Sequence, residues 1–393
     1  MTSNGQMPDA SWPAVVAGDD WADDDARTLP RAALGFAVSA LALAALFAYD
    51  YAVVPAGSPL VADWFTRPTD WLALLAATVL VWAVGPALVR NPARTRRYWL
   101  AFRRDPVALA SGSVVAGFVA VGALGPLVLP TPHYDLSARY QPPAFLGVPA
   151  DVAGSCVGPV RDGVCYGTLA HPLGTAPLGY DMLLLTAWGA HTALVLAVIV
   201  AAVVAVVATA VGTTAAVAGG RVDALLTRYV DLQETVPAFL VYLVVLLLAN
   251  ARFAYFVAVF ALLSWGGVAR TVRSAVRSAR QERYAVAARA AGASRFDVAV
   301  HHLVPAAGSS IAAGVSRQVA LLLLVQAAVG FLGLNETSLP TWGQVVSTGF
   351  RSVGGDPAVV VAWWVAGVPV AALALTVVSL SLAGNAVSDR FAG

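Results

Sequence analysis

Residues 270–305 read RTVRSAVRSARQERYAVAARAAGASRFDVAVHHLVP, and this stretch decides the fold because it is too polar to join the long apolar runs on either side of it. Arginine recurs in it at spacings of three, four and three, which places four guanidinium groups on one face of a helix. These residues are Arg270, Arg273, Arg277 and Arg280. We expect this helix to continue through the alanine-rich residues 285–291 and to close at Gly292, which can adopt a left-handed conformation.

A second, short helix is predicted after Gly292. Ser294 and Asp297 form a capping-box pattern, in which the serine side chain covers a free backbone N–H. Pro305 ends the reach of good helical geometry. The predicted apolar stripe is Phe296, Ala299, Val300 and Leu303. The pattern allows two interpretations: a cytoplasmic loop whose arginines only fix topology, or a docking element whose apolar stripe is buried by a cytoplasmic partner.

The composition is that of an integral membrane protein. The 393 residues are 59% hydrophobic and only 12% charged, whereas soluble domains carry roughly 25% charged residues. All 24 basic residues are arginine, so the chain lacks the lysine that a P-loop needs to reach nucleotide phosphates. It therefore cannot carry a Walker-type ATPase site of its own, and the net charge of +2 gives no reason to expect nucleic acid as a partner.

The expected class is an all-α, polytopic membrane protein with about eight spans, since roughly 20 residues cross the hydrocarbon core. Residues 1–28 are polar and acidic and should form a disordered tail. Residues 29–102 then hold two spans, and residues 103–393 hold the other six. The apolar runs are 32–51, 71–89, 107–129, 184–218, 236–248, 253–268, 311–332 and 358–382.

Two arginine clusters set the expected orientation. One cluster lies between the second and third spans and the other between the sixth and seventh, and cytoplasmic loops are the ones enriched in arginine. Counting crossings from either cluster puts both termini in the cytoplasm. Residues 130–182 and 333–357 are then outside the cell membrane. Cys156 and Cys165 lie in the outer loop 130–182, where they are either joined in a disulfide, which the oxidising exterior permits, or free thiols.

Catalytic chemistry has little support in this sequence. The span interiors hold almost no ionisable side chains, so a carboxylate-based proton relay is not expected. Arg317 is interpreted as an anchor at the membrane interface, and the alternative is a role in the pathway. We expect no catalytic residues, no metal site and no cofactor. The chain is therefore expected to be a pathway-forming subunit whose energy comes from a partner, and the alternative is a secondary transporter driven by an ion gradient.

Several blocks of sequence resemble one transporter family. Ala287-Ala288-Arg289-Ala290-Ala291-Gly292, followed by His302 and by Pro305, resembles the EAA loop of ABC-importer permeases. The similarity is to the C-type permease subunit of the dipeptide/oligopeptide/nickel importers and covers roughly residues 103–391. Four more blocks occur in the family's order: HPLGT at 171–175, GG at 219–220, GFLGL at 330–334 and LAGN at 382–385.

The resemblance implies a six-helix permease core with about two extra N-terminal transmembrane helices. Such a subunit is not an enzyme: it would pair with a homologous B-type permease within the membrane lipid, with two cytoplasmic ABC ATPases and an external solute-binding protein as further partners. Peptides or related small solutes would be the cargo. The residues implied to contact an ATPase are Ala287, Ala288, Gly292, Ala293, Ser294, Arg295, Phe296, His302 and Pro305.

Overall fold

The computed structural model of the protein describes residues 23–55, 57–60, 65–90, 92–249, 253–334, 340–351 and 361–391. Most of the expected acidic tail lies outside these residues. Helix α1 (Asp23–Ala52) already begins at Asp23, so the end of the predicted tail is helical and that part of the prediction is wrong. The described chain is helical apart from one small region at the outer end, which agrees with the expected class.

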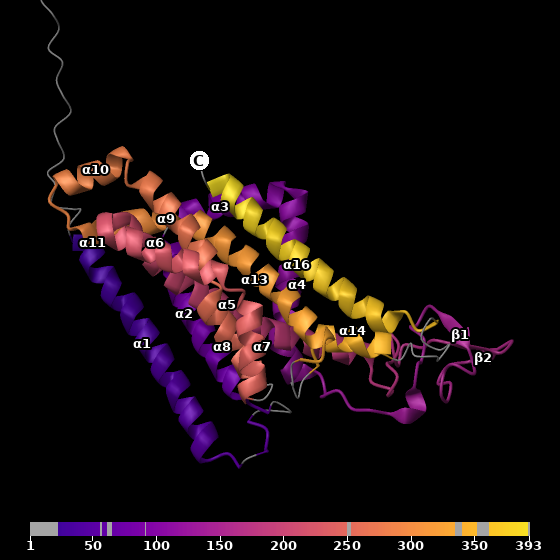
Figure 1. Ribbon diagram of the computed structural model, residues 1–393. Coiled ribbons are helices and arrows are strands. Elements are labelled where there is room, and N and C mark those ends of the chain that lie inside the picture. Colours follow the sequence, from indigo (N-terminus) through magenta and orange to yellow (C-terminus); the bar gives the residue numbers. More distant parts are fainter. Residues whose placement is uncertain are drawn as a thin grey trace, which may run out of the picture.

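Helices α1 and α2 (Pro68–Arg90) form an antiparallel pair that precedes the main bundle. Figure 1 shows α1 standing apart from the bundle, while α2 packs against its central helix. The indole N–H of Trp82 on α2 donates to the hydroxyl of Ser39 on α1 at 3.1 Å. A Cβ at Gly35 would overlap the Trp82 ring, so α1 and α2 approach this closely because position 35 is a glycine. The short basic helix α3 (Pro92–Arg104) follows.

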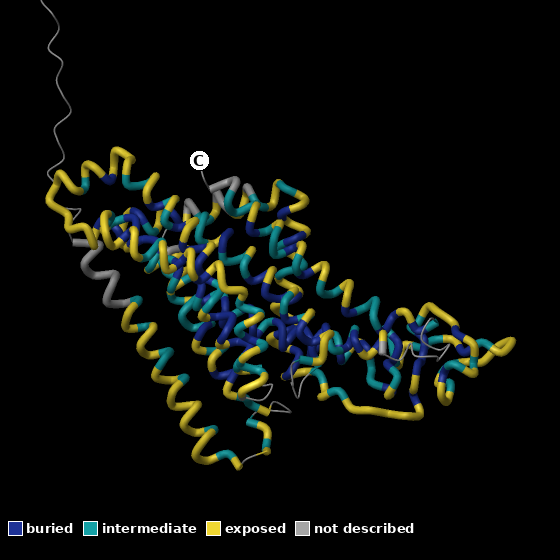
Figure 2. Tube along the Cα trace, viewed as in Figure 1, coloured by how far each residue is buried: buried dark blue, intermediate teal, exposed yellow. Residues whose placement is uncertain are grey.

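The main bundle is built around α5 (Met182–Ala218), whose 37 residues make it longer than one crossing needs. Most of its residues are buried, and it packs against α2, α4 (Pro106–Val128) and α13 (Gly308–Phe331). Helix α16 (Trp364–Phe391) packs along α4 and α13. Buried residues gather in the middle of this bundle, whereas α1 is exposed along most of its length (Figure 2).

The expected spans 236–248 and 253–268 are parts of longer, broken helices. Helices α6 (Gly220–Thr235) and α7 (Ala238–Ala249) meet at a bend of 66°. Helices α8 (Phe253–Leu263) and α9 (Gly266–Ala279) are separated by a break at Ser264 and Trp265. Because α7 and α8 have only 12 and 11 residues, neither crosses a membrane alone.

Within the described residues, seven helices are long and apolar enough to cross a membrane, or eight when the bent pair α6–α7 counts as one span. The stretch that includes α8 and α9 runs from Phe253 to Gln281. Arginines 270–280 therefore lie on the same helical stretch as the apolar residues of α8 and not, as expected, in a loop that follows it.

A small domain is inserted between α4 and α5, and we call it the outer domain after its expected side of the membrane. It contains a 3₁₀ turn η1 (Leu136–Ala138) and three short strands, β1 (Gly147–Pro149), β2 (Val160–Arg161) and β3 (Val164–Tyr166). The strands pair antiparallel in the order β1-β3-β2. Their buried residues form a hydrophobic cluster separate from the bundle core, completed by Val345 of α14 (Trp342–Arg351) and Trp364 of α16. The sequence analysis did not predict this sheet.

Candidate functional site

The arginine-rich stretch forms a chain of short helices at one end of the molecule. The continuous helix expected from 270 to 291 is wrong, because α9 ends at Ala279 and α10 (Arg283–Ala290) begins after a turn. Glu282, the residue before α10, has an extended backbone conformation, which changes the direction of the chain. Figure 1 shows α10 and α3 at the same end as the C-terminus, with the strands and α14 at the opposite end.

The corner at Gly292 is closed by a defined helix-ending motif. Gly292 has φ +93°, and its N–H donates to the carbonyl of Arg289, while the N–H of Ala293 donates to the carbonyl of Ala288. These two bonds are the pattern of a Schellman motif, which needs a left-handed residue at this position and so favours glycine. The left-handed closure predicted at Gly292 is confirmed.

The helix after the corner begins at the predicted cap and does not end at the predicted proline. The Ser294 hydroxyl accepts the N–H of Asp297 at 3.1 Å at the start of α11 (Arg295–Val298). The chain then continues through a π-helical turn (Ala299–Leu303) and α12 (Val304–Ala306) toward α13. Pro305 lies at the start of α12, where its missing N–H is tolerated, so it does not end the helical path as expected.

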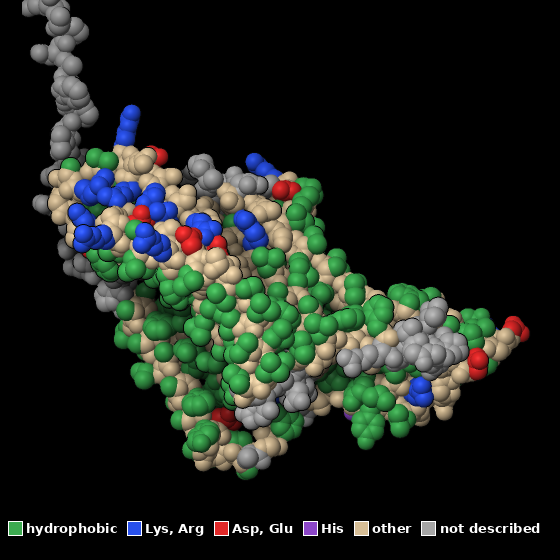
Figure 3. Space-filling model, in the orientation of Figure 1, with side chains coloured by type: hydrophobic (Ala, Val, Ile, Leu, Met, Phe, Trp, Pro, Cys, Tyr) green, Lys and Arg blue, Asp and Glu red, His purple; other side chains and the backbone are tan. Residues whose placement is uncertain are grey.

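The predicted apolar stripe divides into two faces. Ala299 and Leu303 are buried, and Leu303 anchors the segment to the bundle core. Phe296 remains 74% exposed directly after the Gly292 corner, and Val300 and Val286 are also exposed. His302 is exposed as well, with its ring near that of Tyr284. The segment thus presents an uncovered apolar corner at the same end as the basic residues (Figure 3).

The arginine face of α9 is not a free basic surface. Arg273 contacts both carboxylate oxygens of Asp223 on α6, at 2.5 and 2.8 Å, and Arg277 contacts the same carboxylate at 2.5 Å. Arg270 contacts Asp231 and Glu234, also on α6, at 2.8 and 2.7 Å. The four arginines share one face as predicted, but this face binds the neighbouring helices of the same chain.

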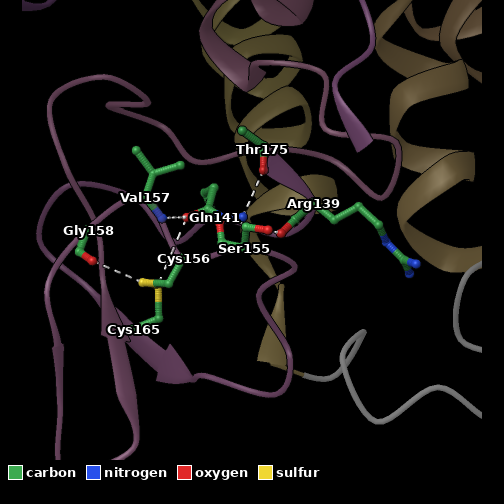
Figure 4. Close-up of a disulfide and its surroundings, with 8 residues drawn as sticks. All are labelled: Arg139, Gln141, Ser155, Cys156, Val157, Gly158, Cys165 and Thr175. Carbon is green, nitrogen blue, oxygen red and sulfur yellow. Dashed lines mark hydrogen bonds between the residues drawn. A yellow bond between two sulfur atoms is a disulfide. The ribbon is translucent and has the colours of Figure 1, made fainter. Parts of the chain in front are cut away.

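The outer domain contains the two cysteines, and the structure joins Cys156 to Cys165 in a disulfide. Figure 4 shows Gln141 beside this bond. The Gln141 side-chain amide donates to the Ser155 carbonyl at 2.9 Å and its oxygen accepts the N–H of Val157 at 3.0 Å. Because both bonds go to residues flanking Cys156, Gln141 and the disulfide hold the same loop against β3.

A second set of bonds fixes the outer domain to the bundle. The Thr175 hydroxyl accepts the backbone N–H of Gln141 at 2.8 Å, and the Trp364 indole donates to the Thr175 carbonyl at 3.1 Å. Asp181 caps the start of α5 and also contacts the His171 ring at 2.9 Å. The segment 171–181 therefore places the outer domain directly on the start of the central helix.

Comparison with known proteins relates this chain to one transporter family. Residues 208–392 match the binding-protein-dependent transport system inner membrane components, and residues 94–143 match the N-terminal transmembrane domain of oligopeptide transport permease C. The oligopeptide permease OppC of Escherichia coli K12 is 31% identical over 221 residues, which is 56% of this chain and 71% of that protein. The chain belongs to this family. It is a permease subunit of an ABC importer and not a catalytic subunit.

Two other relatives extend the similarity. OppC of Mycobacterium tuberculosis (strain CDC 1551 / Oshkosh) is 30% identical over 297 residues, covering 73% of this permease and 90% of the relative. The dipeptide permease DppC of Bacillus subtilis is 22% identical over 298 residues, covering 75% and 84%. Importers of this family use ATPase and binding-protein partners, so the alternative of an ion-gradient-driven transporter is set aside.

Two glycines are close-packing sites in this permease: Gly343 on α14 and Gly384 in the 382–385 block. A Cβ on Gly343 would lie 1.9 Å from the Ala327 carbonyl oxygen, so α14 approaches α13 more closely than any side chain allows. A Cβ on Gly384 would lie 2.9 Å from the side chain of Ser316. At both glycines another helix packs directly against α13, which is the helix that follows the Gly292 segment.

The remaining singled-out residues of this permease lie in and around the spans. Arg317 is exposed on α13, and the side-chain N–H₂ of Gln326 is buried without a partner. His191 on α5 contacts the Gly122 carbonyl at 2.8 Å and lies 3.9 Å from buried Asp70 on α2. Sequence reasoning missed Asp70 because it precedes the apolar run by one residue. The described residues hold no group of three or more His, Cys, Asp or Glu side chains suited to a metal ion.

Proposed function

We propose that this permease forms half of a peptide-import pathway and is driven from the cytoplasm through residues 270–305. The observation that carries the proposal is the exposed Phe296, which lies just after the fixed corner at Gly292. An exposed apolar side chain on a rigid corner suits a partner that buries it. The docking surface consists of Ala287, Ala288, Gly292, Ala293, Ser294, Arg295, Phe296, His302 and Pro305.

The proposed assembly has two permeases, two ATPases and one binding protein. A homologous B-type permease completes the pathway, one cytoplasmic ATPase docks on each permease, and an external solute-binding protein delivers the cargo. Peptides are the proposed cargo because the relatives are named as oligopeptide and dipeptide permeases. Closure of the ATPase pair displaces the docking surface and rocks the helices between two states.

The proposed orientation places both termini in the cytoplasm and the disulfide-bonded domain outside. It is supported by the arrangement of α3 and α10 at one end and the sheet at the other (Figure 1), together with the arginine bias of cytoplasmic loops. We propose three regions: a cytoplasmic tail at 1–28, a two-helix extension at 29–102 and the permease domain at 103–393. The ties between α1 and α2 support the extension as a unit.

Two substitutions test the docking surface. Phe296→Asp places a charge in the surface without disturbing the core, since Phe296 is 74% exposed. Gly292→Pro fixes φ near about −65°, whereas the corner requires a left-handed residue. Both variants should assemble in the membrane but hydrolyse ATP without peptide uptake when reconstituted with their partners. Phe296→Leu is the matched control and should retain uptake. Normal coupled uptake by Phe296→Asp would overturn the docking proposal.

A further inference from the structure

Helix α9, which leads into the docking surface, is fixed to α6 by an ion cluster. Asp223 is only 9% exposed and lies in the first turn of α6, where it accepts hydrogen bonds from both Arg273 and Arg277. One carboxylate thus serves two guanidinium groups on successive turns of α9. Removing it would leave both arginines without the carboxylate that they share. Because Arg277 is the more exposed of the two, the loss falls mainly on the Arg273 pair.

Further contacts extend this tie along α9. Near the start of the helix, Arg270 contacts Asp231 and Glu234 of α6. At its end, the Arg280 guanidinium donates to the Ala216 carbonyl in the last turn of α5 at 2.8 Å. The ion pairs of Arg270, Arg273 and Arg277 therefore tie α9 to α6. The Arg280 bond ties the end of α9 to α5.

The breaks in the two helices lie side by side. The Gln233 side-chain amide at the end of α6 donates to the Leu262 carbonyl at the end of α8, at 2.8 Å. Gly266, the first residue of α9, faces the same side chain, and a Cβ there would lie 2.6 Å from the Gln233 side-chain oxygen. The Tyr229 and Trp265 rings stack at 5.9 Å across the same junction. The α6–α7 bend and the α8–α9 break therefore lie next to each other, and we call this shared position the hinge line.

Beyond the breaks, α7 and α8 form a compact aromatic hairpin. The Tyr242 ring on α7 packs edge-on against Phe256 of α8 at 5.3 Å, and Phe260 lies beside both. The Tyr242 hydroxyl donates to the Leu334 carbonyl beyond α13 at 2.8 Å. The hairpin is thus a second packed unit that joins the α6–α9 pair at the hinge line.

We propose that Asp223 is a positioning residue that joins α6 and α9 into one rigid unit, which we call the lever. The lever carries a displacement of the docking surface to the α7–α8 hairpin. The inference rests on the proposed function, since the displacement comes from an ATPase docked on residues 270–305. Loss of the carboxylate leaves the docking surface and the Arg270 ion pairs in place, but Arg273 and Arg277 no longer hold α9 to α6. ATP hydrolysis then continues while the hairpin stays still.

The test uses the full transporter reconstituted in vesicles with its ATPases and binding protein. In Asp223→Asn, the ATPases should still co-purify, but peptide uptake per ATP hydrolysed should fall several-fold, because Arg273 and Arg277 lose the carboxylate that they share. Spin labels at Leu248→Cys on α7 and Val128→Cys on α4 report hairpin movement, because both positions are exposed and the native cysteines are bonded. The nucleotide-dependent change in their separation should disappear in the variant.

Asp162→Asn is the matched control, since it makes the same change in the outer domain, and it should leave both readouts at wild-type values. Arg277→Gln leaves the Arg273–Asp223 pair in place, so it should give a smaller loss of coupling even where Asp223→Asn fails to assemble. Wild-type uptake per ATP and wild-type label movement in Asp223→Asn or Arg277→Gln would overturn the lever. Failure of the wild-type permease to retain its ATPases would instead contradict the docking proposal.

Discussion

Single residues in this permease matter mainly through backbone geometry and shared partners. Gly292 lies in open space, so its role is conformational: a Cβ there would meet no neighbour, but φ +93° disfavours every L side chain. At Gly174 both the backbone conformation and the available space exclude a side chain: φ is +78°, and a Cβ would lie 2.6 Å from the Trp364 indole nitrogen. The outer domain is therefore more sensitive at Gly174 than the docking corner is at Gly292.

We predict that Gly174→Ala strongly destabilises the outer domain. The left-handed conformation alone costs about 1–2 kcal/mol for an L side chain, and the overlap with Trp364 adds about 1–3 kcal/mol. Gly57→Ala is the matched control because Gly57 has φ +86° with no neighbouring atom, so it incurs only the backbone cost. Thermal unfolding in detergent should show a much larger drop for Gly174→Ala. Equal drops for the two variants would contradict the predicted overlap.

Among the elements, the outer domain is stabilised differently from the bundle. Its strands have two or three residues each, and its hydrophobic cluster is separate from the bundle core. Such short strands give little stability alone, so the Cys156–Cys165 bond and the Gln141 contacts supply the constraint. The bundle helices instead depend on long buried faces and on the ion pairs between α6 and α9.

We predict that opening the disulfide loosens the outer domain without unfolding the bundle. For the short loop that it closes, the chain-entropy estimate is about 2–3 kcal/mol. Cys156→Ser with Cys165→Ser should therefore raise the rate of proteolysis within residues 150–163 several-fold, while the helices stay intact. Adding reductant should produce the same change in the wild-type permease and none in the variant. Mass spectrometry without reductant should find the two cysteine peptides linked, and alkylation of both cysteines would contradict the bond.

At the scale of the whole molecule, the two ends expose different kinds of side chain. Basic helices gather at one end, the disulfide-bonded domain lies at the other, and an apolar surface lies between them (Figure 3). This arrangement fits a bilayer with the arginine-rich end in the cytoplasm. The extension attaches through α2, whose Asp70 contacts His191 of the central helix, while α1 remains exposed along most of its length.

We predict that labelling of intact cells will distinguish the two ends. Single cysteines replacing Phe145 in the outer domain and Arg283 in α10 are both well exposed, and the native cysteines are bonded and unreactive. A membrane-impermeant maleimide should label Phe145→Cys on whole cells and Arg283→Cys only after lysis. The reverse pattern would invert the proposed orientation and place the docking surface outside.

The sequence alone determined the class, the family and the corner of the docking segment. Composition and apolar runs indicate a helical membrane protein because the bilayer requires that every backbone polar group be paired within the chain. Gly292 and Ser294 were predictable because helix ends depend on local conformation and on hydrogen bonds to near neighbours in sequence.

Only the tertiary structure decided where helices break and what the arginines bind. The α6–α9 contacts join residues about 50 positions apart, and no periodicity within one helix reveals which neighbour its charged face meets. The same holds for Asp70 with His191 and for Gln141 with the disulfide loop. The sequence gives each helix its faces, whereas packing between distant segments decides which face meets lipid, which meets protein and which stays uncovered.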